Sequence, residues 1–168
     1  MIVAETERLI IRSWEKDDVE PYFKIIADED VMKFINGGKA LSIKDAEQYV
    51  DSYLSNFEQY GWSRFVVEIK ETKEFAGFCG FKFFNNELDF GWRFGKAFWG
   101  KGIGSEAAKT VLKLGLHRFQ FKRIVCIVYP ENIPSIKIIK KLNFQFEKSI
   151  TLNDQELLQY SFRNNIIK

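Results

Sequence analysis

The segment from Trp99 to Ser105 places three glycines at alternate positions directly before a predicted helix. It reads Trp99-Gly100-Lys101-Gly102-Ile103-Gly104-Ser105. Alternating glycines let the backbone bend with its N–H groups converging and no side chain in the way. A helix N-terminus adds unsatisfied donors and the positive end of the helix dipole. This segment therefore predicts a diphosphate site built from backbone amides, and a tight connection without a ligand is the alternative that it leaves open.

Two familiar phosphate-binding motifs do not fit this segment. The pattern GxxxxGK[ST] is absent, and the dinucleotide fingerprint GxGxxG fails because Ala107 stands where its third glycine would be. The segment also follows a predicted antiparallel meander rather than the first strand of a βαβ unit, which argues against a Rossmann domain.

The composition excludes several other classes of protein. The chain has 168 residues, 25 basic and 23 acidic, and a formal net charge of +2, so it lacks the basic excess of nucleic-acid binders. It has one histidine and no Cys/His cluster, so we expect no metal site. Cys79 and Cys126 stand in apolar runs, which indicates buried, reduced thiols. With no signal peptide and no apolar stretch of about 18 residues, we expect a cytoplasmic protein with no membrane partner.

The elements that must position the glycine-rich segment begin with a mostly helical part. The spacing of apolar residues predicts one strand over 6–12 and two or three helices before residue 61. Ser42 followed by Asp45 resembles a capping box, and Gly61 is typical of a helix end. Three strands with short connections follow, over 63–69, 75–84 and 87–94, which indicates an antiparallel meander.

After residue 94 the pattern alternates between helices and strands. It predicts a helix over 102–118, a buried strand over 123–129 and a helix over 132–142 that ends at Asn143. A hairpin over Asn153-Asp154 closes the chain, from strands at 144–150 and 156–162. We therefore predict one α+β domain over 1–168, with a mixed, mostly antiparallel sheet of about seven strands flanked by helices.

Several segments, in order along the chain, resemble the GNAT superfamily of N-acetyltransferases. The first is Thr6–Arg12, followed by Asp89–Phe94 and by Phe98–Ala107. Glu131–Ser135 and Lys141–Phe144 then resemble the "ENxxS…KLGF" segment of the branch of ribosomal-protein N-terminal acetyltransferases, which is RimJ/RimL-like.

The resemblance implies acetyl-CoA as cofactor, with its diphosphate on the backbone amides of the glycine-rich turn. It assigns this role to Gly100, Lys101, Gly102, Ile103, Gly104 and Ser105. Trp99 replaces the family's usual Gln or Arg, as the RimJ/RimL-like branch does. Lys101, and Lys140 or Lys141, are candidates to meet phosphates.

The resemblance also implies that the pantetheine arm lies between two splayed parallel strands and pairs with Trp92-Arg93-Phe94. Gly91 suits a bulge there, and a backbone N–H near Phe94 would polarise the thioester carbonyl. Asn132 would hold the arm from the opposite strand, and it is also suited to cap a helix.

The family's chemistry needs an amine that loses a proton and a thiolate that is stabilised. The resemblance ranks Asp89 first and Glu87 second as base or amine-orienting group, and ordinary solvent-facing carboxylates are the alternative. Ile139 stands where many members of the family have a tyrosine that acts as the general acid. Ser135 is therefore the expected hydrogen-bond donor to the thiolate. We expect direct attack by the bound amine.

The sequence thus predicts transfer of an acetyl group from acetyl-CoA to a primary amine, on a protein N-terminus or on a small molecule. The first 60 residues and the last hairpin are expected to choose the acceptor. The alternative is a non-catalytic acyl-CoA-binding sensor or interaction module. Both a monomer and a homodimer remain open, and we expect no nucleic-acid partner.

Overall fold

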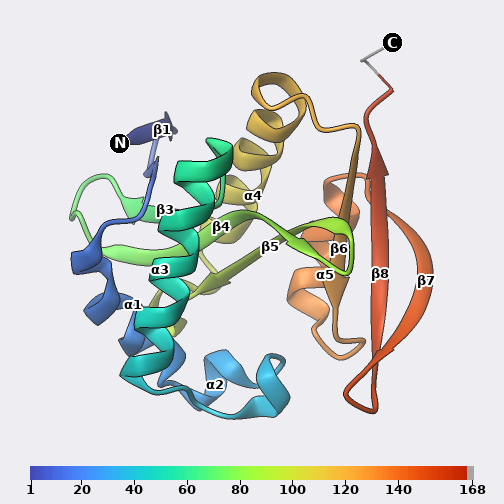
Figure 1. The fold of residues 1–168 in the computed structure, drawn as a ribbon, viewed down its shortest axis with the longest axis horizontal. Helices are drawn as coiled ribbons and strands as arrows, with labels where there is room; N and C mark the ends of the chain where they lie inside the picture. Colours follow the sequence, from blue (N-terminus) through green and yellow to red (C-terminus); the bar gives the residue numbers. More distant parts are fainter. Residues whose placement is uncertain (166–168) are drawn as a thin grey trace.

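The computed structural model describes residues 1–165 as a mixed sheet of eight strands with helices on both faces (Figure 1). The strands are β1 (Ile2–Glu5), β2 (Leu9–Arg12), β3 (Arg64–Ile69), β4 (Phe75–Phe84), β5 (Glu87–Phe94), β6 (Arg123–Val128), β7 (Gln145–Leu152) and β8 (Gln155–Arg163). Their order across the sheet is β1-β2-β3-β4-β5-β6-β8-β7. Of the neighbouring pairs, β5 and β6 are parallel and the others are antiparallel. The predicted α+β fold is confirmed.

Five α-helices cover the two faces of this sheet. They are α1 (Val19–Ile26), α2 (Glu29–Met32), α3 (Ile43–Tyr60), α4 (Ile103–Lys113) and α5 (Ile133–Lys141). In Figure 1, α3 lies in front of the sheet and α4 behind it. Among the described residues, no helix is long and apolar enough to cross a membrane.

The alternation of side chains along the central strands builds a separate apolar cluster on each face. Val66 of β3 packs with Tyr22 of α1 and Val50 of α3. Its neighbour Phe65 packs on the other face with Val111 of α4. The sheet therefore holds α1 and α3 on one side and α4 on the other, with the glycine-rich segment at the start of α4.

Local signals in the sequence set several element ends as expected. The side chain of Ser42 accepts a hydrogen bond from the Asp45 backbone N–H, and the Asp45 carboxylate accepts one from the Ser42 backbone N–H, so the capping box of α3 is confirmed. Gly61 ends that helix at a φ of 72°. The two-residue turns Asn85-Asn86 and Asn153-Asp154 have positive φ at all four residues, as hairpin turns of this length require.

The predicted elements are wrong in two places. The strand predicted over 6–12 begins only at Leu9, because the Thr6 hydroxyl accepts the Leu9 N–H and folds the chain into a turn. The residues before that turn form β1, which raises the strand number from about seven to eight. The helix predicted over 102–118 is regular only to Lys113 and ends in a π-helical turn, Leu114–Arg118.

The parallel strands β5 and β6 separate soon after they meet. Their pairing is confined to Asp89 and Val125. Beyond this pair, the second half of β5 remains hydrogen-bonded to β4, while β6 continues along β8. The predicted splayed pair of parallel strands is therefore present, and the gap between them opens toward the C-terminal ends of both strands.

The predicted bulge at Gly91 is wrong. The register between β4 and β5 runs without a shift from Phe84 opposite Glu87 to Gly77 opposite Phe94. The absence of a side chain at Gly91 serves another purpose. A Cβ atom there would lie 3.0 Å from Nη1 of Arg64, so the glycine leaves room for that guanidinium.

Candidate functional site

A cavity of about 280 Å³ opens where β5 and β6 separate. Four residues predicted to take part in binding or catalysis line it, namely Asp89, Trp92, Asn132 and Ser135. The sequence placed them as far as 46 positions apart, and the fold brings them together. The remaining wall is mostly apolar and comes from the segment after α2, from β4, β5 and β6, from α5 and from the last hairpin: Phe34, Ile35, Asn36, Lys82, Phe84, Phe90, Gly91, Cys126, Ile127, Val128, Tyr129, Ile139, Leu152 and Leu157.

Asp89 is held at the floor of this cavity by a buried ion pair. Its Oδ2 lies 2.5 Å from Nη2 of Arg64, and the two side chains are 11% and 6% exposed. The Arg64 side chain crosses the paired glycines Gly80 and Gly91 to reach it, and Nη1 donates to the Gly80 carbonyl. Oδ1 of Asp89 accepts no hydrogen bond from any residue that the structure describes. One carboxylate oxygen is thus fixed, and the other is available to a ligand.

Lys82 is a cation of the cavity wall that the sequence analysis missed. It stands directly opposite Asp89 in the β4–β5 hairpin. Burial, and after it the charge of Arg64, lower the pKa of Lys82 to about 8. The signal was in the sequence, because a two-residue turn at Asn85-Asn86 fixes the register and so places residue 82 opposite residue 89.

Glu87 is not brought to this cavity. It lies two residues before the last paired position of β5, on the closed side of the gap. Its carboxylate accepts hydrogen bonds from Arg123 at 2.7 to 3.2 Å, and the same guanidinium binds Glu147 of β7. Arg123 therefore ties β5, β6 and β7 together, and Glu87 is engaged by a cation that it shares with Glu147.

The start of α5 supplies the opposite wall. The Oδ1 atom of Asn132 accepts the Ser135 backbone N–H at 3.3 Å, so the predicted helix cap is confirmed. The Ser135 hydroxyl faces the same cavity and makes no hydrogen bond to any residue from 1 to 165. Ile139, 2% exposed, fills the position one turn further along. Burial raises the pKa of the Cys126 thiol well above its ordinary value, so that residue acts as a wall and not as a nucleophile.

The three residues expected to pair with the pantetheine arm face in different directions. Trp92 lines the cavity. Arg93 points to the face of α1 and α3, where Nη1 donates to the Tyr22 hydroxyl at 2.7 Å. Phe94 is buried behind the sheet with α4. Trp92 therefore contributes to the cavity lining, whereas the side chains of Arg93 and Phe94 are engaged elsewhere.

The glycine-rich turn is exposed and has no side-chain cap. Gly100 and Gly102 have φ angles of 69° and 76°, which favour glycine, and both are solvent-exposed. No side chain of the described residues caps the N-terminus of α4, so its first amides keep their hydrogen-bonding capacity. Trp99 beside them is 45% exposed, and its indole N–H donates to the Phe94 carbonyl at 2.9 Å.

Arg8 fastens this turn to the sheet, which the sequence analysis did not foresee. Its Nη1 donates to the Lys101 carbonyl at 2.8 Å, and its Nε donates to Glu106 at 2.7 Å. The Thr6 hydroxyl also donates to Glu106. Residues before β2 and in the first turn of α4 thus hold the glycine-rich turn from both sides.

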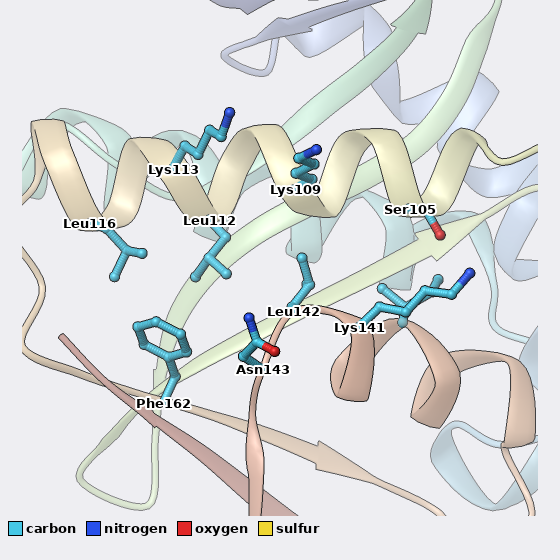
Figure 2. Close-up of a pocket in the computed structure, with 10 residues that line it drawn as sticks. Ser105, Lys109, Leu112, Lys113, Leu116, Lys141, Leu142, Asn143 and Phe162 are labelled. Atoms are coloured by element: carbon cyan, nitrogen blue, oxygen red, sulfur yellow. The ribbon is translucent and has the colours of Figure 1, made fainter.

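A second cavity, of about 450 Å³, lies between α4 and α5 (Figure 2). Figure 2 shows Ser105 and Lys141 at one end, with Leu112, Leu116 and Phe162 toward the other. Lys109 and Lys113 also line it, and no carboxylate does among the residues of the described part of the chain. Lys140, the other predicted phosphate contact, is absent from the lining. This cavity begins at the residue where the glycine-rich turn ends.

Within residues 1–165, no three histidine, cysteine, aspartate or glutamate side chains are grouped so that they could hold a metal ion. The site must therefore be understood from its backbone donors, its two carboxylate oxygens and its cations.

Comparison with known proteins agrees with this geometry. The family model for the acetyltransferase (GNAT) domain matches residues 8–145. The chain is 32% identical over 145 residues to the uncharacterized N-acetyltransferase p20 of Bacillus licheniformis, which covers 84% of this chain and 82% of that protein. The crystal structure of a GNAT-family acetyltransferase from Bacillus anthracis has a TM-score of 0.82 at 28% identity, over 98% of this chain and 99% of that one.

A further similarity concerns the fold alone. RimL, a ribosomal L7/L12 alpha-N-protein acetyltransferase solved in complex with coenzyme A, has a TM-score of 0.80 at 16% identity, over 97% of this chain and 98% of that one.

Since the family model spans most of the sequence and the relative from Bacillus licheniformis covers 84% of it, this chain belongs to the GNAT family and is an acetyltransferase.

Proposed function

We propose that this enzyme transfers the acetyl group of acetyl-CoA directly to a primary amine. The observation that carries the proposal is the separation of β5 and β6 after Asp89 and Val125, together with the cavity that opens there. An extended ligand arm can hydrogen-bond to a strand edge that has lost its neighbour. The freed edge of β5 beyond Asp89 is such a site.

The glycine-rich turn would hold the diphosphate of coenzyme A. Its support is the exposed backbone at Gly100 to Gly102 and the uncapped start of α4, because these amides bind anions without any charged side chain. Lys141 lines the adjoining cavity and is placed to meet the other phosphates of the nucleotide. Lys101 is exposed within the turn itself and remains a candidate for the same role.

Asp89 and Ser135 would serve the chemical step from opposite walls of the cavity. Acetyl-CoA supplies the thioester. The free Oδ1 of Asp89 would accept a hydrogen bond from the acceptor amine and orient its lone pair toward the carbonyl carbon. As the new C–N bond forms and the C–S bond breaks, the amine loses a proton to solvent or to the carboxylate. The Ser135 hydroxyl would donate a hydrogen bond to the departing thiolate.

The test is calorimetry with coenzyme A, followed by measurement of thiol release from acetyl-CoA with a panel of amines and N-terminal peptides. We expect coenzyme A to bind at micromolar to millimolar concentrations and thiol release to depend on the acceptor. Binding without acceptor-dependent release would favour the acyl-CoA-binding sensor. No binding at millimolar coenzyme A would contradict both.

Replacing Arg8 with alanine should weaken coenzyme A binding without unfolding the enzyme. Arg8 is 45% exposed and fixes the turn through the Lys101 carbonyl and Glu106. Losing one or two such hydrogen bonds, each worth about 0.5–1.5 kcal/mol, should raise the Kd for coenzyme A about three- to tenfold. Calorimetry of the Arg8→Ala variant measures this change.

The control for Arg8 is Lys16→Ala. Lys16 also forms an exposed ion pair, with Asp51 of α3, on the opposite face of the sheet. This substitution should leave the Kd for coenzyme A unchanged. Equal effects of the two substitutions would mean that Arg8 does not act through the turn.

A further inference from the structure

Lys82 is a charged residue of the cavity that has no part in the proposed chemistry. Its side chain is partly buried and lines the cavity beside Asp89. No ion pair and no hydrogen bond joins its Nζ to a residue in the described part of the chain. Its Nζ lies 5.6 Å from the centroid of the Phe84 ring, and Asp89 acts on its charge across the strand pair without a hydrogen bond. Partial burial of an ammonium without a bound anion costs free energy. A ligand with an anionic group would compensate for this cost.

The charged groups around Lys82 leave this side of the sheet with an excess of positive charge. Residues that face each other in an antiparallel pair share one face, and the pairing of β3, β4 and β5 puts Arg64, Lys82, Asp89 and Arg93 on the same face. Two carboxylates share this face of β5: Asp89, whose Oδ2 is bound to Arg64, and Glu87, which is bound to Arg123. Arg93 donates to a phenol and not to a carboxylate. Among the described residues, both carboxylates are bound to arginines, and Lys82 and Arg93 have no carboxylate partner.

The wall of the cavity around Lys82 is mostly apolar. Phe34 and Ile35, from the segment after α2, and Leu152 and Leu157, from the last hairpin, complete the wall. Those are the two parts of the chain expected to choose the acceptor. A low-polarity wall strengthens the attraction between a fixed charge and an opposite one. The cavity therefore favours a ligand with an anionic group for Lys82 and apolar or neutral atoms elsewhere.

From this arrangement we propose that the acetyl acceptor is an amine that also carries an anionic group, a carboxylate or a phosphate, and that Lys82 binds this group. The inference rests on the proposed function, since it names the class of acceptor for that same cavity. Asp89 would bind the amine end and Lys82, opposite it on the neighbouring strand, the anionic end. Lys82 is thus a specificity-determining residue, and a polyamine is disfavoured as the acceptor.

Binding of product analogues tests this inference without requiring turnover. The enzyme is first saturated with coenzyme A. The affinities of N-acetylglycine and N-acetylated phosphoethanolamine are then measured by calorimetry beside their uncharged counterparts, N-acetylglycinamide and N-acetylethanolamine. We expect at least one anionic ligand to bind tenfold or more tightly than its uncharged counterpart. The carboxylate and phosphate arms show which anion the site prefers.

Substitutions at Lys82 assign the preference to this residue. Lys82→Met should abolish the preference for the anionic ligand and leave the affinity of the uncharged counterpart within about twofold. Lys82→Arg should retain it, since a guanidinium keeps the charge. Lys82→Met is not expected to unfold the enzyme, because it removes a partly buried charge. A melting curve verifies this.

The pH dependence gives an independent readout. The charged groups that face Lys82 are Arg64 and Asp89, and Arg93 lies on the same side of the sheet. The protonated fraction of Lys82 falls as pH rises through about 8. The preference for the anionic ligand should therefore decline from pH 7 to pH 9.5 in the wild type, and it should persist to pH 9.5 in Lys82→Arg.

Three results would overturn the inference: equal affinity for anionic and uncharged ligands in the wild type, no measurable binding of either, or a preference that survives in Lys82→Met. The proposed function fails separately. Its failure appears as an absence of coenzyme A binding, or as no acceptor-dependent thiol release with any amine. An enzyme that acetylates neutral amines as readily as anionic ones retains the proposed function and refutes the role of Lys82.

Discussion

Replacing Asp89 with alanine is expected to lower the free energy of unfolding by about 3–5 kcal/mol, because it leaves the Arg64 guanidinium buried without its carboxylate. The two side chains are only 6% and 11% exposed, so water cannot replace the lost partner. The buried Nε of Arg64 already has no hydrogen-bond partner within the described residues. Urea unfolding followed by circular dichroism measures the loss.

The double variant Arg64→Met/Asp89→Leu separates this structural role from the catalytic one. Replacing both members of a buried pair by apolar residues is often neutral or stabilising, so the double variant should recover most of the stability that Asp89→Ala loses. It should not recover turnover. We expect kcat/KM to remain at least about 100-fold below the wild type, the lower end of what a positioned proton acceptor contributes. A stable double variant with wild-type turnover would show that Asp89 only supports the fold.

Glu87→Gln is the matched comparison on the same strand. Glu87 is bound to Arg123 on the closed side of the gap. Its replacement should change kcat/KM by less than about threefold, whereas Asp89→Asn should lower it at least about 100-fold. The opposite order would make Glu87 the group that serves the acceptor.

Replacing Gly102 with valine is expected to weaken coenzyme A binding at least tenfold, which corresponds to about 1.4 kcal/mol. Gly102 has a φ of 76°, where an L side chain costs about 1–2 kcal/mol. To relieve this strain the turn must change shape, and its amides then no longer converge. Calorimetry with coenzyme A measures the affinity, and thermal unfolding measures the cost to stability.

Gly61→Val is the matched control for that substitution. Gly61 has a φ of 72° and, like Gly102, no backbone atom close to the position of a Cβ, but it ends α3 on the other face of the sheet. Its loss of stability should be similar, while the affinity for coenzyme A should stay within about twofold of the wild type. If both variants lose affinity equally, strain in general and not the turn is responsible.

The residues of the hairpin turns show how far local sequence reaches. Asn85-Asn86 and Asn153-Asp154 adopt the positive φ angles that a two-residue turn needs, and asparagine and aspartate tolerate them well. Such turns fix the register of the strands that they join. The position of Lys82 opposite Asp89 could therefore be predicted from the sequence.

The partner of Asp89 was not readable in this way. Arg64 lies on β3, whose register against β4 shifts between Val67 and Glu68, and Lys73 in the turn that follows has a φ of 62°. A shift of one residue in register moves every side chain to the other face. The close approach of Arg64 over Gly91 depends on three strands together, so Gly91 resembled a bulge when its own strand was considered alone.

The sequence by itself determined the α+β class, the capping box of α3 and the glycine-rich turn before α4, because each depends on the conformational preferences of a few neighbouring residues. Tertiary structure alone decided that Glu87 is engaged by Arg123 while Asp89 keeps one oxygen free in the cavity. The two carboxylates are chemically alike and lie on the same face of β5. What separates them is the point at which β5 and β6 part, and that point is set by long-range packing on both sides of the sheet.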